Sequence, residues 1–102
     1  MSGVGKAREA LTRRILDGDG QAPASERRAA FEASGLAEPI RGLVDKVARR
    51  AWEVTDEDIA AARASGLSED RIFEIVVCAA VGAATRQYDT ARAALDAAAG
   101  KE

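Results

Sequence analysis

The fold of this chain is decided by the stretch IFEIVVCAAVGAA, which occupies residues 72–84. One apolar stripe runs from Ile72 to Ala83 at helical spacing, and a second stripe runs beside it from Phe73 to Ala84. A helix that is apolar nearly all round belongs in the interior of a fold. We therefore expect this helix to be central and buried.

The central helix extends beyond this stretch in both directions. Ser68 has the side chain of an N-cap residue, and the two acids that follow it suit the positive end of a helix dipole. Past Gln87 polar residues return, and Asp89 and Arg92 mark a solvated face. The helix is predicted to start after Ser68 and to run to about Ala98.

Two shorter helices are predicted just before the central one. Pro39 suits a first helical turn, because its missing N–H costs nothing there. The apolar residues that follow it fall on one helical face, namely Ile40, Leu43, Val44, Val47, Ala48 and Ala51. Thr55 followed by Asp58 resembles a capping box that opens the next helix, and that helix is predicted to end at Gly66.

The first third of the chain adds two more helices. Apolar residues recur at helical spacing over Val4–Asp17, and two glycines within residues 18–21 stop that helix. A short helix follows Pro23, with Ser25 as its predicted N-cap and Gly35 just past its end.

These elements predict an all-α fold of about five helices with a long central C-terminal helix. No stretch alternates apolar and polar residues over the length of a strand. A chain of 102 residues is one domain at most. We expect a single compact domain, with residues 1–35 as an N-terminal helical extension and residues 36–102 as a helical core.

Composition narrows the chemistry that is open to this domain. The chain has no histidine and a single cysteine, Cys78, which excludes histidine bases, cysteine–histidine catalysis and thiolate zinc sites. Asp17–Gln21 resembles the start of a calcium loop, but Ala22 and Arg28 occupy the positions that need glycine and a bidentate glutamate. Gly3–Lys6 lacks the rest of a phosphate loop. We expect no metal and no cofactor.

The charges argue against nucleic acid and membranes as partners. The net charge is −2, and charged residues of both signs are interspersed. The spacing from Ala62 to Ile75, with Gly66 at the turn, matches a helix-turn-helix, yet its second helix would bring Glu69 and Asp70 towards a polyanion. No apolar run reaches membrane-spanning length, and none near the first residue resembles a signal peptide. We expect a cytoplasmic protein.

The segment ASGLSEDRIFE at residues 64–74 resembles the helical hairpin of the carboxymuconolactone decarboxylase and alkylhydroperoxidase D-like superfamily. In that superfamily an alanine-rich helix ends at a glycine, and a turn with a small or hydroxyl residue and two acids opens a long alanine-rich helix. The resemblance covers about Leu36 to Leu95 and implies an alkylhydroperoxidase D-like helical bundle. It also implies a homo-oligomer, because members are commonly trimers, hexamers or related rings.

Redox members of this superfamily carry a CxxC pair and a histidine upstream of that glycine. The corresponding positions here hold Ala51, Val54 and Asp58, and Glu38 lies next to the position of a helper glutamate. A dithiol peroxidase needs an attacking thiolate and a resolving thiol, and neither stands at these positions. We therefore expect no thiol peroxidase activity, and we expect Cys78 to be a small buried core residue.

Two functional hypotheses follow. The first is a cysteine-depleted, non-redox member that acts as an oligomeric scaffold, or as a binding module for a small acidic ligand or a partner protein. The alternative is a carboxymuconolactone decarboxylase-type enzyme that acts on a small organic acid. In that enzyme Asp58 or Glu57 would be the acid/base group, and Arg50 or Arg86 would bind the substrate carboxylate.

We expect the homo-oligomer to form around the last two helices. Five helices of this size cannot easily cover both apolar stripes of the last helix, so Phe73, Val76, Val77 and Val81 would remain partly exposed in a monomer. The small residues around Gly82 would let a helix of a neighbouring subunit approach closely.

Overall fold

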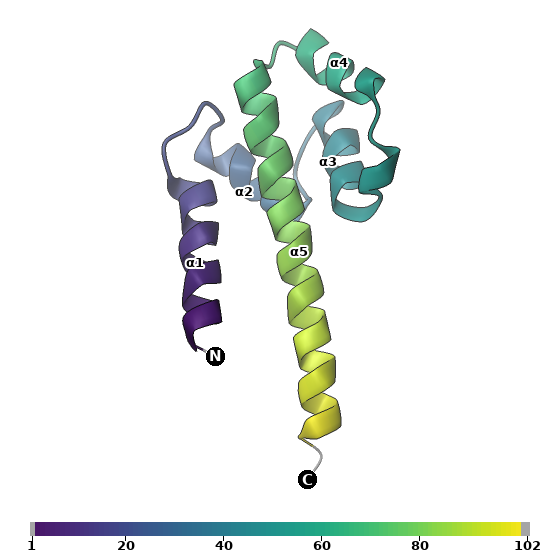
Figure 1. The fold of residues 1–102 in the computed structure, drawn as a ribbon. Helices are drawn as coiled ribbons and strands as arrows, with labels where there is room; N and C mark the ends of the chain where they lie inside the picture. Colours follow the sequence, from purple (N-terminus) through teal and green to yellow (C-terminus); the bar gives the residue numbers. More distant parts are fainter. Residues whose placement is uncertain (1, 101–102) are drawn as a thin grey trace.

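The computed structural model describes residues 2–100, and within this range the chain forms helices and no strand. The helices in chain order are α1 (Ser2–Asp17), α2 (Ala24–Glu32), α3 (Ile40–Arg49), the short 3₁₀ helix η1 (Ala51–Glu53), α4 (Asp56–Ala64) and α5 (Glu69–Ala99). α5 runs through the middle of the molecule, with α1 on one side and α3 and α4 on the other (Figure 1). The predicted all-α class with a long C-terminal helix is confirmed.

α5 begins and ends close to where the sequence predicts. Ser68 is its N-cap, and the Ser68 hydroxyl oxygen accepts a hydrogen bond from the backbone N–H of Arg71 at 3.1 Å. Glu69 and Asp70 lie in the first turn, where carboxylates interact favourably with the helix dipole. The helix then continues for 31 residues to Ala99.

The predicted capping box at the start of α4 is present. The Thr55 hydroxyl oxygen accepts from the backbone N–H of Asp58 at 3.3 Å, and the Asp58 carboxylate accepts from the backbone N–H of Thr55 at 2.9 Å. α4 ends at Ala64, and Gly66 follows with a φ of 106°, a conformation that costs glycine little. This turn leads the chain into α5.

The predicted ends of α2 are partly wrong. Ser25 is not the N-cap, because α2 begins at Ala24 directly after Pro23 and Ser25 lies inside the first turn. At the other end Ala33 adopts the left-handed conformation with a φ of 55°, and its backbone N–H bonds back to carbonyl oxygens of α2. Gly35 lies past the end as predicted, but an alanine makes the reversal of the chain.

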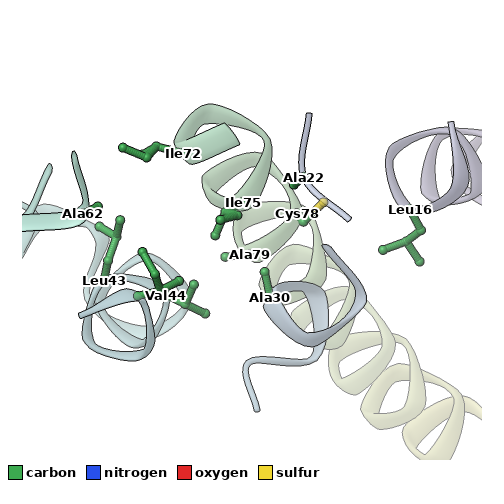
Figure 2. Close-up of a cluster of buried hydrophobic side chains, with 11 residues drawn as sticks. Leu16, Ala22, Ala30, Leu43, Val44, Ala62, Ile72, Ile75, Cys78 and Ala79 are labelled. Carbon is green, nitrogen blue, oxygen red and sulfur yellow. The ribbon is translucent and has the colours of Figure 1, made fainter. Parts of the chain in front are cut away.

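The core lies where α5 meets the four preceding α-helices. Its buried members are Leu16, Ala22, Ala30, Ile40, Leu43, Val44, Ala62, Ile72, Ile75, Cys78 and Ala79 (Figure 2). The α5 residues among them belong to one side of the helix, whereas Phe73 on the other side is 67% exposed. The central position of α5 is thus confirmed, but its burial all round is not, because α1–α4 leave one side of it uncovered.

The segment containing α1 and α2, predicted as an extension, shares this core. Leu16 of α1 and Ala30 of α2 are both buried in it. α1 begins at Ser2, slightly before its predicted start, and the side chain of Val4 lies outside the described part of the structure. One core therefore spans the predicted extension and the predicted helical core.

Gly82 packs against the chain's own α2, so the prediction that it admits a neighbouring subunit is wrong. A Cβ atom at this position would collide with the backbone of Phe31 in the last turn of α2. Ala79 and Ala83 on the same side of α5 are buried as well. These small residues allow close approach within one chain.

The last part of α5 projects beyond the core. All α5 residues from Arg86 onward are exposed, and the described chain measures 55 × 28 × 20 Å. The first turns of α1 reach this projection, where Arg8 donates to the Asp89 carboxylate at 2.7 Å and lies 4.8 Å from the centre of the Tyr88 ring. Among residues 2–100, no helix has both the length and the apolar character needed to cross a membrane.

Candidate functional site

Asp58 is held by several hydrogen bonds. Its carboxylate accepts from Nζ of Lys46 at 2.9 and 3.1 Å and from the backbone N–H of Thr55 at 2.9 Å. These bonds lower the pKa of the Asp58 carboxyl, with Thr55 as the largest cause and Lys46 next. A general acid or base that works at neutral pH needs a raised pKa instead. The arrangement suits a helix cap that ties α3 to α4.

Two other predicted site residues have surface positions at helix ends. Glu57 is exposed in the first turn of α4. Nε of Arg50 donates to the Glu53 carboxylate at 2.8 Å, and its Nη1 lies 3.5 Å from the Asp45 carboxylate. Arg50 therefore links the end of α3 to η1, and the cationic partner of Asp58 is Lys46 rather than Arg50.

Arg86 acts at the end of α2. Its Nη1 donates to the carbonyl oxygen of Phe31 at 2.6 Å, and a cation at the C-terminal end of a helix also interacts favourably with the helix dipole. At 1.5 Å per residue, Arg86 lies about 25 Å along α5 from Glu69, whereas α4 lies beside the start of α5 (Figure 1). The structure does not bring Arg86 to Asp58.

The positions that the predicted resemblance aligns with a dithiol lie at η1. Ala51 opens η1 and is exposed, and Val54 directly after η1 is half-buried against the core. Glu38 accepts a hydrogen bond from the backbone N–H of Gly42 at 3.1 Å, so it belongs to the first turn of α3. Ala51 and Val54 offer no nucleophile, and Glu38 serves the end of a helix.

The cationic groups near the helical hairpin of α4 and α5 are paired with carboxylates. Arg71 donates to both oxygens of Glu26 at 2.8 and 2.9 Å, and Arg63 lies 3.0 Å from the Glu69 carboxylate. A protein that binds DNA needs cations that are free to contact phosphates. Arg71 and Arg63 thus form ion pairs within the chain, and the absence of nucleic-acid binding stays a prediction.

A cleft of about 410 Å³ between α1, α2 and α5 brings polar groups and the single thiol together. Its lining residues are Arg14, Ile15, Gly18, Asp19, Arg27, Phe73, Glu74, Val77 and Cys78. Sγ of Cys78 lies 3.6 Å from the carbonyl oxygen of Ile15, and burial raises the pKa of the thiol. Cys78 is buried, as predicted, and a raised pKa keeps the thiol protonated at neutral pH.

Arg27 and Glu74 hold the loop between α1 and α2 in place. Arg27 is only 7% exposed and donates to the carbonyl oxygens of Ala22 and Ile15, both at 3.1 Å. The Glu74 carboxylate accepts from the backbone N–H groups of Gln21 at 2.8 Å and Ala22 at 2.7 Å. Arg27 thus ties α2 to the end of α1 and to Ala22 of the loop, and Glu74 fixes the loop to α5.

Prediction from the sequence missed both Arg27 and Glu74 as structural residues. The sequence could have indicated the role of Glu74, because it is the one acid within residues 72–84 and an acid in a buried segment needs partners. The sequence could not have indicated the role of Arg27, since Arg28 beside it has the same side chain and lies exposed. The difference between the two arginines arises only when α2 packs against the loop.

We expect Glu74 to make the fold sensitive to acid. Hydrogen bonds from Ala22 and Gln21 lower its pKa below the ordinary value of 4.5, against the opposing effect of burial. Its contribution to stability is therefore fully present above pH 4.5 and is lost as the pH falls through its folded-state pKa. Urea unfolding at a series of pH values should show a shallower acid dependence for Glu74→Gln than for the wild type. Glu9→Gln, which removes an exposed acid from the middle of α1, should leave the slope unchanged, and equal slopes in all three proteins would contradict this account.

A second feature is an apolar stripe along α5, which we call the α5 stripe; Val77 at its start also lines the cleft, and its members from Ala84 onward are exposed. Its members are Val77, Val81, Ala84, Tyr88, Ala91, Leu95 and Ala98. Leu95 is 65% exposed and Tyr88 is 41% exposed, whereas the two valines are half-buried. Soluble monomers rarely expose a long continuous apolar surface, and such surfaces mark sites of interaction.

The cleft beside Cys78 and the α5 stripe are thus the two candidate sites that we identify among the described residues. In the cleft, Arg27 and Glu74 are bound to backbone groups, whereas the stripe residues from Ala84 onward are exposed although Arg8 of α1 lies beside Tyr88. Comparisons of the chain with family models, with curated proteins and with solved structures found no match.

Proposed function

We propose that this protein is a non-redox, homo-oligomeric scaffold or binding module with an alkylhydroperoxidase D-like helical core. One observation carries the proposal: every member of the α5 stripe from Ala84 onward is exposed, although Arg8 of α1 lies beside Tyr88. A helix with an apolar side exposed to water gains free energy when a partner covers that side. Self-association supplies such a partner without a second gene product.

The surroundings of Cys78 support the non-redox part of the proposal. A reactive thiol needs exposure and a lowered pKa, but Cys78 is buried and burial raises its pKa. Ala51 and Val54 at η1 supply no second thiol. Peroxide turnover through a dithiol therefore has no pair of sulfur atoms to use.

The enzyme hypothesis lacks a comparable observation. Asp58 is bound to Lys46 and Thr55, and Arg86 is bound to the end of α2. A decarboxylase of the type considered would need a carboxylate and an arginine that converge on one cleft. The scaffold or binding role is the function that the geometry supports best.

The experiment that tests the proposal is light scattering after size exclusion at micromolar protein concentration. We expect a defined species larger than the 10.7 kDa chain. Leu95→Glu should convert it to smaller species, because a carboxylate would then face the covered apolar surface. Ala93→Glu adds the same charge two residues away on another side of α5 and should leave the assembly intact. A folded wild-type monomer would refute the proposal.

A further inference from the structure

The α5 stripe has the spacing of a coiled coil. Its members from Val77 to Ala98 recur at alternating steps of four and three residues. A helix with this repeat keeps one apolar seam facing a partner helix. Along the exposed part of the seam, larger residues alternate with alanine in the order Val81, Ala84, Tyr88, Ala91, Leu95 and Ala98.

The surface of α5 also carries a hole of the kind that a partner side chain fills. A hollow of about 450 Å³ is lined by Tyr88, Ala91, Arg92 and Leu95. These residues stand at i, i+3, i+4 and i+7, and four residues in this pattern form the hole that receives a knob in coiled-coil packing. Ala91 forms the low point of this group, because its side chain is the smallest of the four.

We infer that a second copy of this chain occupies the α5 stripe, with the two α5 helices antiparallel and paired about a twofold axis between Asp89 and Thr90. This inference rests on the proposed function, because it names the surface through which the oligomer forms. In this register Val81 packs against Ala98 of the second copy, Ala84 against Leu95, and Tyr88 against Ala91. The twofold axis generates the same three contacts a second time.

The alternation of large and small residues selects the antiparallel orientation. In that orientation every layer combines one large residue with one alanine, so the layers have similar volumes and pack evenly. In a parallel pair Tyr88 would meet Tyr88 and Leu95 would meet Leu95, while the alanine layers between them would leave gaps. The stripe is therefore complementary in shape to a reversed copy of itself.

The charges beside the stripe are complementary in the same register. Asp89 of the second copy would lie about 3 Å along the helix axis from the level of Arg92, on the same flank of the pair, and an arginine side chain spans such an offset. Within one chain Arg8 bonds to Oδ1 of Asp89, and Arg92 bonds to the Tyr88 hydroxyl and lies 3.5 Å from the Asp96 carboxylate. The pair between copies would add Arg92 of one copy to Oδ2 of Asp89 of the other, and the twofold axis repeats it. A parallel pair would instead place each residue level with its identical copy. Charge complementarity therefore favours a second copy over an unrelated apolar helix.

The inference is tested by cross-linking with a short bismaleimide. Ala84→Cys, Leu95→Cys and the double variant are compared with the wild type, whose Cys78 is buried and serves as the background. In the antiparallel register residues 84 and 95 of different copies are in contact, so the double variant should cross-link almost completely. Each single variant should remain uncross-linked, because its two cysteines would lie about 16 Å apart along the axis.

Each outcome separates this inference from the proposed function. Cross-linking of the single variants would show a parallel pair and overturn the inference, although the oligomer would stand. If light scattering gave the mass of a trimer, the inference would also be overturned and the oligomer would stand. A twofold contact generates dimers or, with a second interface, hexamers. An oligomer whose double variant fails to cross-link would place the interface elsewhere. A monomer would overturn both the inference and the proposed function.

Residues 84 and 95 are exposed, and circular dichroism before labelling verifies that the cysteine variants fold.

Discussion

Gly82→Ala should destabilise the protein by about 2 kcal/mol or more, even though alanine is the better helix former. The added Cβ would collide with the backbone of Phe31, and a backbone cannot move aside as the end of a side chain can. The same Phe31 carbonyl oxygen accepts the hydrogen bond of Arg86, so a shift of α2 would break that bond too. The free energy of unfolding from urea titrations measures the effect.

The matched control is Gly5→Ala in α1. No other group lies within 4 Å of a Cβ at that position, so this substitution should stabilise the helix by up to about 1 kcal/mol. The two glycine-to-alanine changes are thus expected to have opposite signs. Equal effects would mean that α2 and α5 are not packed as closely as described.

Arg27→Met should be the second large loss, about 3 kcal/mol. Methionine fills much of the same volume, but it removes the guanidinium donor from the carbonyl oxygen of Ala22 and leaves that of Ile15 with the weak S–H donor of Cys78. It also removes the positive charge near Glu74. The expected result is a lower thermal unfolding temperature together with a loosened loop between α1 and α2, which limited proteolysis would detect.

Arg28→Met is the control for Arg27→Met, because the two residues are neighbours with the same side chain. Arg28 is 52% exposed and pairs with Asp17 at the surface, where an ion pair contributes about 0.5 kcal/mol or less. The control should therefore leave stability nearly unchanged. If both variants lost the same amount, the burial of Arg27 would not be the cause.

The helices themselves were largely predictable from the sequence. Ser68 and Thr55 act as N-caps where the pattern placed them, because a cap depends on residues only three positions apart. Ser25 failed as a predicted cap, since Pro23 allows the helix to begin two residues earlier. Local rules thus gave the elements and erred by a residue or two at their ends.

The packing partners were not predictable, because they depend on which sides of the helices meet. The small residues around Gly82 allow close approach, but the sequence does not say whether the approaching helix belongs to the same chain. The same holds for the predicted site residues, since Asp58 and Arg86 are both suited to chemistry and the fold assigns both to helix ends. The alkylhydroperoxidase D-like architecture remains a prediction.

The position of α5 in the chain has a consequence for how the protein is made. Leu16, Ala30, Val44 and Ala62 all belong to a core whose centre is Ile75 on the helix that ribosomes synthesise after the other four. A nascent chain that ends before α5 has made most of its helices but has no surface on which to bury them. The core closes only when residues near Ala79 have emerged from the ribosome, so the tertiary structure forms only after most of α1–α4 has been synthesised, and until then their apolar sides are open to chaperones.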